Sequence, residues 1–267
     1  MKTLLITIPI RPTPSEFPPI GLLSIMQAMR KAGINNFEFY NIDGNRPSYK
    51  DALKYIIRAN PDIVFISAVV STSYSYTKNI TQDIRSSLPN VLIVLGGSMA
   101  ASAEILLKRT NVDICVTGEG EITNCNVIKQ FSKTRDIKDL VNIRGIVMLI
   151  DNRLINTGYE EQISKEHVYD IDWEDLEKSS DINQFMVPAF NREGEACAWF
   201  KNDQRTYEPH RKNKTVASLP CSKGCIAKCT FCHRFTSGIR YIPNEIIEQR
   251  IVQLIKKYNV GFISIVD

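Results

Sequence analysis

One stretch of the chain reads Val91-Leu92-Ile93-Val94-Leu95-Gly96-Gly97. A short, continuous apolar run of this kind is typical of a strand that is buried on both faces of a parallel sheet. The two glycines that follow it carry no side chain, so the backbone there can turn and come close to a bulky ligand. The stretch therefore predicts a buried strand that runs into a turn.

The same pattern recurs on both sides of this stretch. Further strand-like runs lie at residues 3–8, 37–42, 62–67 and 112–116. Helical spacing of apolar residues separates them, at residues 21–33, 48–59, 71–88 (the weakest), 100–109 and 122–131. Five strands that alternate with helices predict an α/β fold with a doubly wound parallel sheet of the Rossmann or flavodoxin type. The segments 143–150 and 153–157, joined by Asp151-Asn152, predict a hairpin that closes this domain.

Ligands of such sheets bind outside the carboxyl ends of the strands, where the strand order reverses. The loops expected at that edge are residues 9–19, 43–47, 67–73, 96–100 and 117–121. Their glycines fit a ligand cradle and also fit tight turns that hold no ligand. The residues alone leave both interpretations open.

The composition limits the class of protein. The 267 residues are 43% hydrophobic and 23% charged, which excludes wholesale disorder and a collagen-like fibre. A net charge of +4 is too weak to indicate a nucleic-acid partner, and no nucleic-acid-binding motif accompanies it. No stretch approaches the roughly 18 consecutive apolar residues of a membrane span. Pro9 and Arg11 interrupt the apolar start, so we expect no export signal and a cytoplasmic protein.

Charge divides the chain into three parts. Residues 160–181 carry nine acidic side chains against two lysines, whereas residues 199–267 carry twelve basic side chains and five acidic ones. The basic excess fits an anionic ligand or a thiolate cluster, and it fits an ordinary solvated surface as well. We therefore expect an α/β domain at 1–158, a solvated acidic linker at 159–198 and a different domain at 199–267.

Four of the seven cysteines lie close together, namely Cys221, Cys225, Cys229 and Cys232. In a reducing compartment such a group indicates metal ligands more than disulfides. Zinc sites usually separate two short knuckles by a dozen or more residues, whereas one compact loop suits the several irons of an iron–sulfur cluster. Three thiolates would leave one iron of a four-iron cluster open for a small molecule. Structural zinc or a fully ligated cluster stays an alternative, particularly if Cys221 is a fourth ligand.

The cysteines lie inside a β-loop-α-β pattern. A strand is expected at 215–219, a helix begins near Pro243, whose missing N–H costs nothing at a helix start, and a second strand is expected at 262–266. The cysteines would then follow the carboxyl end of the first strand. Parallel barrels hold their active sites at that edge.

At this point the chain resembles a known family. Cys225-x-x-x-Cys229-x-Phe231-Cys232, after a strand and the turn Ser222-Lys223-Gly224, resembles the radical S-adenosylmethionine superfamily. The elements before it resemble the cobalamin-binding branch of that superfamily, and these are Pro18-Pro19-Ile20-Gly21-Leu22, Ser67, Gly96-Gly97 and Gly118-Glu119-Gly120-Glu121. The resemblance covers nearly the whole chain and implies that the first βαβ unit of a partial TIM-type barrel follows the sheet.

The resemblance also implies a chemistry. Cys225, Cys229 and Cys232 would ligate a [4Fe–4S] cluster whose open iron binds S-adenosylmethionine, with Phe231 near the adenine. One electron, from a donor such as a flavodoxin or ferredoxin, would cleave the sulfonium to a 5′-deoxyadenosyl radical, with methyl transfer from cobalamin as the preferred outcome. The expected cobalamin contacts are Pro19, Gly21, Ser67, Gly96, Gly97, Gly118, Glu119 and Gly120.

The histidines bear on the cobalamin prediction. The chain has only His167, His210 and His233, so the first 166 residues contain none. If cobalamin binds the sheet, we expect no histidine from that domain on the cobalt. His233, next to Cys232, is expected to be an incidental polar neighbour of the cluster.

The chain departs from the family pattern in three places. Lys223 stands where arginine is common, and Ile226 stands where proline is common; both changes look tolerable. The chain stops at Asp267, after the second expected barrel strand. We therefore expect a fragment that does not turn over alone.

A second hypothesis belongs to a different class. The chain could be a non-catalytic module, in which the sheet holds cobalamin or a nucleotide and the cysteine loop holds a structural metal. The substrate and the oligomeric state are not readable from the sequence. Cyclisation and ring contraction are rivals of methyl transfer as the reaction outcome.

Overall fold

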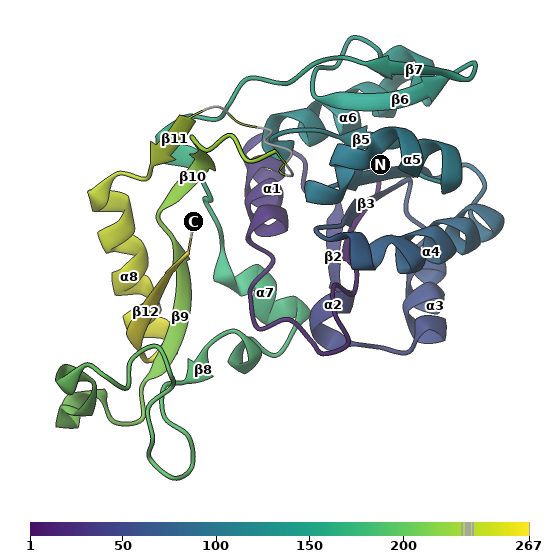
Figure 1. Ribbon diagram of the computed structural model, residues 1–267. Helices are drawn as coiled ribbons and strands as arrows, with labels where there is room; N and C mark the ends of the chain where they lie inside the picture. The colour runs from purple at the N-terminus through teal and green to yellow at the C-terminus, as the bar shows by residue number, and fades with distance from the viewer. Residues whose placement is uncertain (231, 233–235, 237, 267) are drawn as a thin grey trace.

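The computed structural model describes residues 1–230, 232, 236 and 238–266. Two sheets lie side by side, and residues 160–181, which we call the acid-rich segment, run between them (Figure 1). The first sheet has the strand order β2-β1-β3-β4-β5-β6-β7, and the second has the order β12-β9-β8. Among the described residues, no helix combines the length and apolar character needed to cross a membrane.

The first sheet has the predicted doubly wound arrangement. Its first five strands run parallel to one another, which confirms the predicted fold class. The strands are β1 (Thr3–Thr7), β2 (Phe37–Asn41), β3 (Ile63–Ser67), β4 (Leu92–Gly96) and β5 (Ile114–Val116). The strand order reverses between β1 and β3, because β2 lies outside β1 while the later strands continue on the other side.

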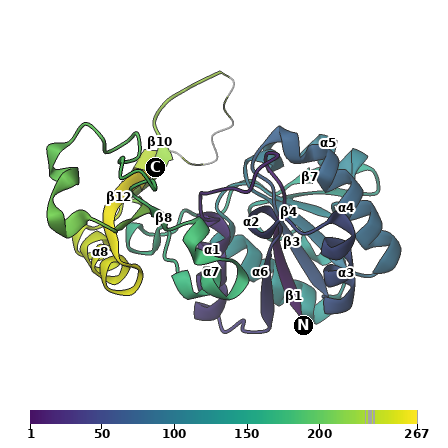
Figure 2. The same ribbon diagram turned by 90° about the horizontal axis from the view of Figure 1, so that it is seen from below.

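Helices cover both faces of this sheet (Figure 2). One layer contains α1 (Ile20–Lys31) and α6 (Gly120–Thr134); the other contains α3 (Tyr49–Ala59), α4 (Tyr74–Ser87) and α5 (Ala103–Arg109), and α2 (Ile42–Asn45) is a single turn after β2. The alternation of side chains along each strand builds two cores. In β3, Ile63 and Phe65 pack in the α1 and α6 core, whereas Val64 and Ile66 pack in the core of the opposite layer.

The predicted closing hairpin is confirmed. It consists of β6 (Ile146–Ile150) and β7 (Arg153–Asn156), and β6 pairs antiparallel with β5 at the end of the sheet. Asp151 and Asn152 have φ values of 48° and 62°, so both turn residues adopt the left-handed conformation that a tight two-residue hairpin requires. Asp and Asn tolerate that conformation better than most residues.

The acid-rich segment differs from the expectation of a solvated linker. It contains α7 (Trp173–Ser179), and Trp173, Asp175 and Leu176 of this helix are buried. Asp175 pairs with Arg30 of α1, while Glu174 and Glu177 lie 3.0 and 2.9 Å from the Lys257 ammonium of the second sheet's helix. Basic partners on both sides therefore hold α7 between its neighbours, a pairing that sequence spacing does not reveal.

The second sheet carries the predicted β-loop-α-β unit. β9 (Thr215–Pro220) and β12 (Val260–Val266) are parallel neighbours, α8 (Asn244–Tyr258) connects them, and β8 (Val187–Pro188) pairs with the other edge of β9. Two further strands were not predicted, because they are short and polar: β10 (Ser222–Cys225) and β11 (Gly238–Tyr241) form an antiparallel hairpin. This hairpin brackets the cysteine loop.

Short 3₁₀ turns make up the remaining regular structure of the described residues. They lie at Ser71–Ser73, Ser98–Ser102, Ile137–Leu140, Lys165–His167, Ile182–Gln184, Gln204–Tyr207 and Pro209–Arg211. The first two follow β3 and β4 directly, at the edge where the ligand was expected.

Gly97 tests whether the turn after β4 needs a glycine. Its φ is +88°, and a Cβ at this position would lie 2.5 Å from the Ala68 carbonyl oxygen. Gly33, with a φ of +77°, is the matched control, because a Cβ there has nothing within 4 Å. We expect Gly33→Ala to lower the free energy of unfolding by about 1 kcal/mol from backbone strain, and Gly97→Ala by about 3 kcal/mol from strain and overlap together. Urea denaturation measures both, and equal losses would contradict the close approach to Ala68.

Candidate functional site

A pocket of about 550 Å³ opens at the carboxyl edge of the first sheet. The ends of β1, β3, β4 and β5 form its floor. Tyr169 of the acid-rich segment, Phe185 after it, Pro220 and Val266 of the second sheet, and Lys223 of β10 also line it. Its volume is that of a small-molecule or cofactor site. The pocket therefore lies at the predicted edge, but both sheets line it.

The residues predicted to contact cobalamin converge on this pocket. All eight line it, although they come from four separate loops, and these are Pro19, Gly21, Ser67, Gly96, Gly97, Gly118, Glu119 and Gly120. Whether they contact cobalamin stays a prediction. The described lining residues include no histidine, and the identity of any axial ligand to cobalt stays a prediction as well.

The glycines of the pocket serve different purposes. Gly97 and Gly118 have positive φ values of 88° and 101°, which other residues rarely adopt. Gly120 lets α6 approach α1, because a Cβ would lie 2.9 Å from Ile25 Cδ1. Gly21 has neither restriction: it lies in the first turn of α1, and a Cβ there would meet nothing within 4 Å. The absence of a side chain at Gly21 leaves space in the pocket itself.

The pocket wall contains a buried side-chain oxygen that has no partner among the described residues. Asn124 of α6 is 4% exposed, and its Oδ1 accepts no hydrogen bond from the described residues. A buried acceptor without a donor costs about 1–3 kcal/mol, and such groups in native proteins usually await a water or a ligand. Sequence analysis missed Asn124. The available signal was that a polar residue stands between Thr123 and Cys125, in a helix that is buried at these positions.

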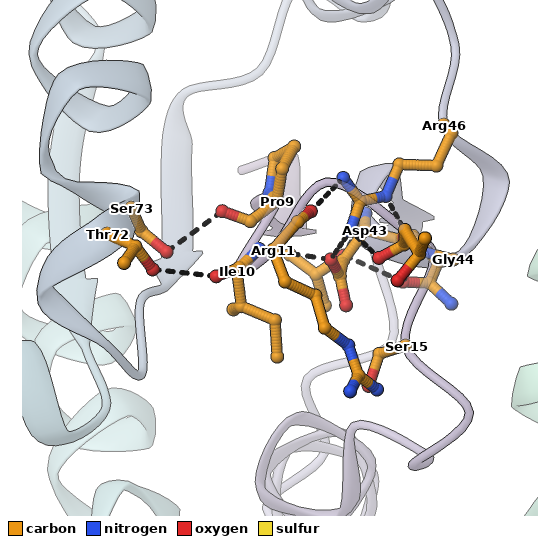
Figure 3. A network of polar contacts seen from close by, with 12 residues as sticks. Pro9, Ile10, Arg11, Ser15, Asp43, Gly44, Arg46, Thr72 and Ser73 are labelled. Carbon is orange, nitrogen blue, oxygen red and sulfur yellow. Dashed lines mark hydrogen bonds and ion pairs between the residues drawn. The ribbon is translucent and has the colours of Figure 1, made fainter.

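The proline-rich loop at the mouth of the pocket is fixed by side chains that sequence analysis also missed. The Arg46 guanidinium donates to the carbonyl oxygens of Arg11 and Thr13, at 2.7 and 2.6 Å, and to the Asp43 carboxylate at 2.6 Å (Figure 3). Asp43 in turn accepts from the Ile10 amide at 3.2 Å.

The turn after β3 holds the same loop from its other side. Thr72 and Ser73 donate their hydroxyl groups to the carbonyl oxygens of Ile10 and Pro9, at 2.6 and 2.9 Å. Phe17, which is 59% exposed, and the neighbouring prolines follow this part of the loop and line the pocket. Apolar groups that face the opening in this way suit a ligand with a large apolar face.

The cysteine loop presents three thiols to solvent. Cys225, Cys229 and Cys232 are exposed, and none of the seven cysteines, all of which belong to the described part of the chain, forms a disulfide. The donors therefore match the thiolate chemistry of an iron–sulfur cluster. Within the described residues, no three Cys, His, Asp or Glu side chains converge closely enough to hold one metal ion. Phe231 and His233 lie outside the described residues.

Cys221 differs from the other three cysteines of the group. It lies directly after β9, is half-buried, and packs against the core that α1 and α6 share with the second sheet. Its thiol lies 3.8 Å from the Leu219 carbonyl oxygen. Whether Cys221 ligates a metal stays a prediction.

The geometry of the pocket agrees with the comparison with known families. The family model described as "B12 binding domain" matches residues 6–128, from β1 into α6. Residues 6–128 are therefore similar to B12-binding domains. Most residues that line the carboxyl-edge pocket lie in this matched part of the chain, and the predicted resemblance to cobalamin-binding radical S-adenosylmethionine proteins is confirmed.

The similarity to known proteins extends beyond residues 6–128. Two anaerobic magnesium-protoporphyrin IX monomethyl ester cyclases, from Cereibacter sphaeroides and Synechocystis sp., are 22% and 25% identical over 259 residues, or 94% of this chain. The chain spans 37% and 45% of their lengths. The cobalamin-dependent S-adenosylmethionine radical enzyme OxsB, solved with aqua-cobalamin and S-adenosylmethionine bound, has the same fold, with a TM-score of 0.70 at 18% identity over 100% of this chain and 34% of OxsB.

The reactivity of the thiols tests whether some cysteines are exposed, as in the cysteine loop, while Cys115 and Cys125 are buried. Burial raises the pKa of Cys115 to about 12 and that of Cys125 to about 11, so almost no reactive thiolate forms near neutral pH. We expect N-ethylmaleimide to modify Cys225, Cys229 and Cys232 at least about 100-fold faster than these two, as measured by peptide mass spectrometry. In urea all sites should react alike. Rapid native labelling of Cys115 would contradict its burial in β5.

Proposed function

We propose that this chain is the cofactor-binding part of a cobalamin-dependent radical S-adenosylmethionine enzyme. The observation that carries the proposal is the convergence of eight separately predicted residues on one pocket at the ligand edge of the B12-binding domain. The exposed cysteine loop supports the second half of the proposal, because its motif and its three thiols fit a [4Fe–4S] cluster.

The pocket residues would bind the corrin by shape and by polar pairing. The corrin is a large, mostly apolar ring with amide side chains. Phe17, Val69 and the prolines would cover its apolar surface, Gly21 would leave space for it, and the Asn124 carbonyl oxygen would accept from an amide N–H. Exclusion of water by these walls would strengthen each polar contact inside. Arg46 would affect cobalamin binding indirectly, because it holds the proline-rich loop that precedes Phe17.

The cysteine residues would serve the second cofactor. Cys225, Cys229 and Cys232 would supply thiolates to the cluster, and Phe231 would lie against S-adenosylmethionine. When bound, these groups supply one-electron and radical chemistry that protein side chains lack. We further propose that the protein works in the reducing cytoplasm with a flavodoxin- or ferredoxin-like donor, because the thiols must stay reduced.

Two reaction outcomes are compatible with the proposal. Methyl transfer is the outcome that we predict from the family resemblance. Cyclisation is the second candidate, because two relatives that match 94% of this chain are named as cyclases. The relatives are more than twice as long as the matched part, so substrate and turnover belong to the whole protein. A non-catalytic module is the remaining alternative.

Anaerobic reconstitution separates an enzyme from a module. We expect the purified chain to bind about four irons and four sulfides and to show an electron paramagnetic resonance spectrum that changes when S-adenosylmethionine is added. One zinc and no sulfide would favour the non-catalytic module. Replacement of Cys221 by Ala should leave the iron content unchanged if three thiolates suffice.

Gly21 tests cobalamin binding directly. We expect Gly21→Leu to weaken hydroxocobalamin binding at least about tenfold, because the new side chain occupies pocket space, and Gly21→Ala to weaken it less. Stability should be unchanged or higher, since leucine favours a helix by about 1 kcal/mol over glycine. Equilibrium dialysis and thermal unfolding measure the two effects. Lys133→Leu, on an exposed position of α6 outside the pocket lining, is the control that should bind normally.

Asn124 tests the polar part of the site. Replacement by leucine removes the unpaired Oδ1, so we expect the free energy of unfolding to stay equal or rise. Hydroxocobalamin affinity should fall about two- to tenfold, the worth of one hydrogen bond. A loss of stability together with unchanged affinity would mean that the group pairs within the protein and not with the ligand.

A further inference from the structure

Four charged side chains meet where the B12-binding domain touches the cysteine hairpin. Glu119 and Glu121 come from the turn and the first residues of α6, and Lys223 and Arg240 come from β10 and β11. We call these four residues the charge clamp. Glu121 Oε1 lies 2.9 Å from Lys223 Nζ, Glu119 Oε1 lies 3.9 Å from the same ammonium, and Glu119 pairs closely with the Arg240 guanidinium.

The charge clamp is buried and electrically balanced. The side chains of Glu119, Glu121, Lys223 and Arg240 are only 5%, 6%, 14% and 17% exposed. Two carboxylates face two cations, so no net charge is taken from water. Removal of one partner of a buried pair leaves an uncompensated charge and is strongly destabilising, whereas removal of both partners costs much less. The two sides are therefore energetically coupled.

Neutral groups complete the hydrogen bonding of the glutamates. Ser24 of α1 donates its hydroxyl to Glu121 Oε1 at 2.9 Å, and the Ile163 amide donates to Glu119 Oε2 at 3.0 Å. The Arg240 guanidinium also donates to Glu119 Oε2 at 3.2 Å. Both oxygens of Glu119 are thus engaged within the protein. Glu119 therefore lines the pocket and contacts the hairpin at the same time.

The hairpin needs these carboxylates for its own pairing. Lys223 and Arg240 are directly opposite each other in the antiparallel register of β10 and β11. Like charges in that position repel and destabilise a hairpin. The hairpin in turn brackets Cys225, Cys229 and Cys232, so the glutamates of the B12-binding domain stabilise the base of the cysteine loop.

We propose that the charge clamp positions the cysteine hairpin and couples it to occupancy of the pocket. Gly118 and Gly120, on either side of Glu119, line the pocket, and so does Lys223 from the other side. A ligand that fills the pocket therefore contacts both the turn that carries Glu119 and the hairpin that carries Lys223, and it stabilises the contact between them. By linkage, an intact clamp must strengthen binding of that ligand by the same factor. This proposal rests on cobalamin as the occupant.

Hydrogen–deuterium exchange of the full chain, with hydroxocobalamin as the probe, tests the coupling. In the wild type, saturating hydroxocobalamin should slow exchange of the amides of 222–225 and 238–241 about tenfold. Lys223→Met should abolish this protection and weaken binding about tenfold, whereas Lys223→Arg should retain both within about threefold. Ser24→Ala, which changes no charge, is the milder variant and should give an intermediate loss if Lys223→Met does not fold.

A double variant separates positioning from general destabilisation. Lys223→Met combined with Glu121→Gln leaves no unpaired charge, so its ligand-free hairpin should exchange more slowly than that of Lys223→Met alone. Lys138→Met, which removes an exposed pair with Asp151, is the control and should leave hairpin exchange unchanged. Additive effects in the double variant, or protection that survives in Lys223→Met, would overturn the coupling.

The same experiment distinguishes failure of this proposal from failure of the proposed function. If wild-type protein does not bind hydroxocobalamin, the cofactor assignment fails and the coupling fails with it. The positioning role is then decided by ligand-free exchange alone. Faster hairpin exchange in Lys223→Met, with recovery in the double variant, supports it, and unchanged exchange overturns it.

Discussion

Burial of the central strands on both faces is the constraint on which the rest of the structure depends. β3 and β4 are sandwiched between two helical layers, so every connection from one parallel strand to the next must cross a face as a helix. The five parallel strands β1 to β5 then end at the same edge, and the loops that follow them gather there. The pocket exists because this connectivity brings residues 7–21, 41–44, 65–69, 96–98 and 116–124 together.

The second sheet completes this site. The acid-rich segment joins the two sheets, with Asp175 paired to Arg30 on one side and with Glu174 and Glu177 paired to Lys257 on the other. Net charge along the sequence indicated a solvated linker, but the negative segment neutralises basic residues on both neighbours. The excess of basic side chains after residue 199 is used in part for such contacts. Charge here joins parts of one fold.

The shape of the pocket and a buried hydrogen-bond acceptor in its wall both suit a ligand. Glycines and apolar side chains leave a shaped opening, while Arg46 and the 3₁₀ turn after β3 fix the loop at its mouth. Among the residues that the structure describes, none donates a hydrogen bond to the buried acceptor Asn124 Oδ1. By contrast, the cysteine loop is exposed, and its three thiols do not converge on one metal position. The pocket is therefore shaped by the fold itself, whereas the three thiols lie on an exposed loop.

The sequence by itself determined the elements and their class. Apolar runs, helical spacing and turn residues are local properties, and they predicted five parallel strands, the hairpin at Asp151-Asn152 and the unit of β9, α8 and β12. The eight predicted residues that line the pocket came from the resemblance to a known family. Only the tertiary structure decided the partners of charged and buried polar groups. Glu121 and Lys223 are separated by about a hundred positions in the chain, and the lack of a donor for Asn124 is a property of its surroundings. Burial and pairing depend on which surfaces meet, and no local pattern records that.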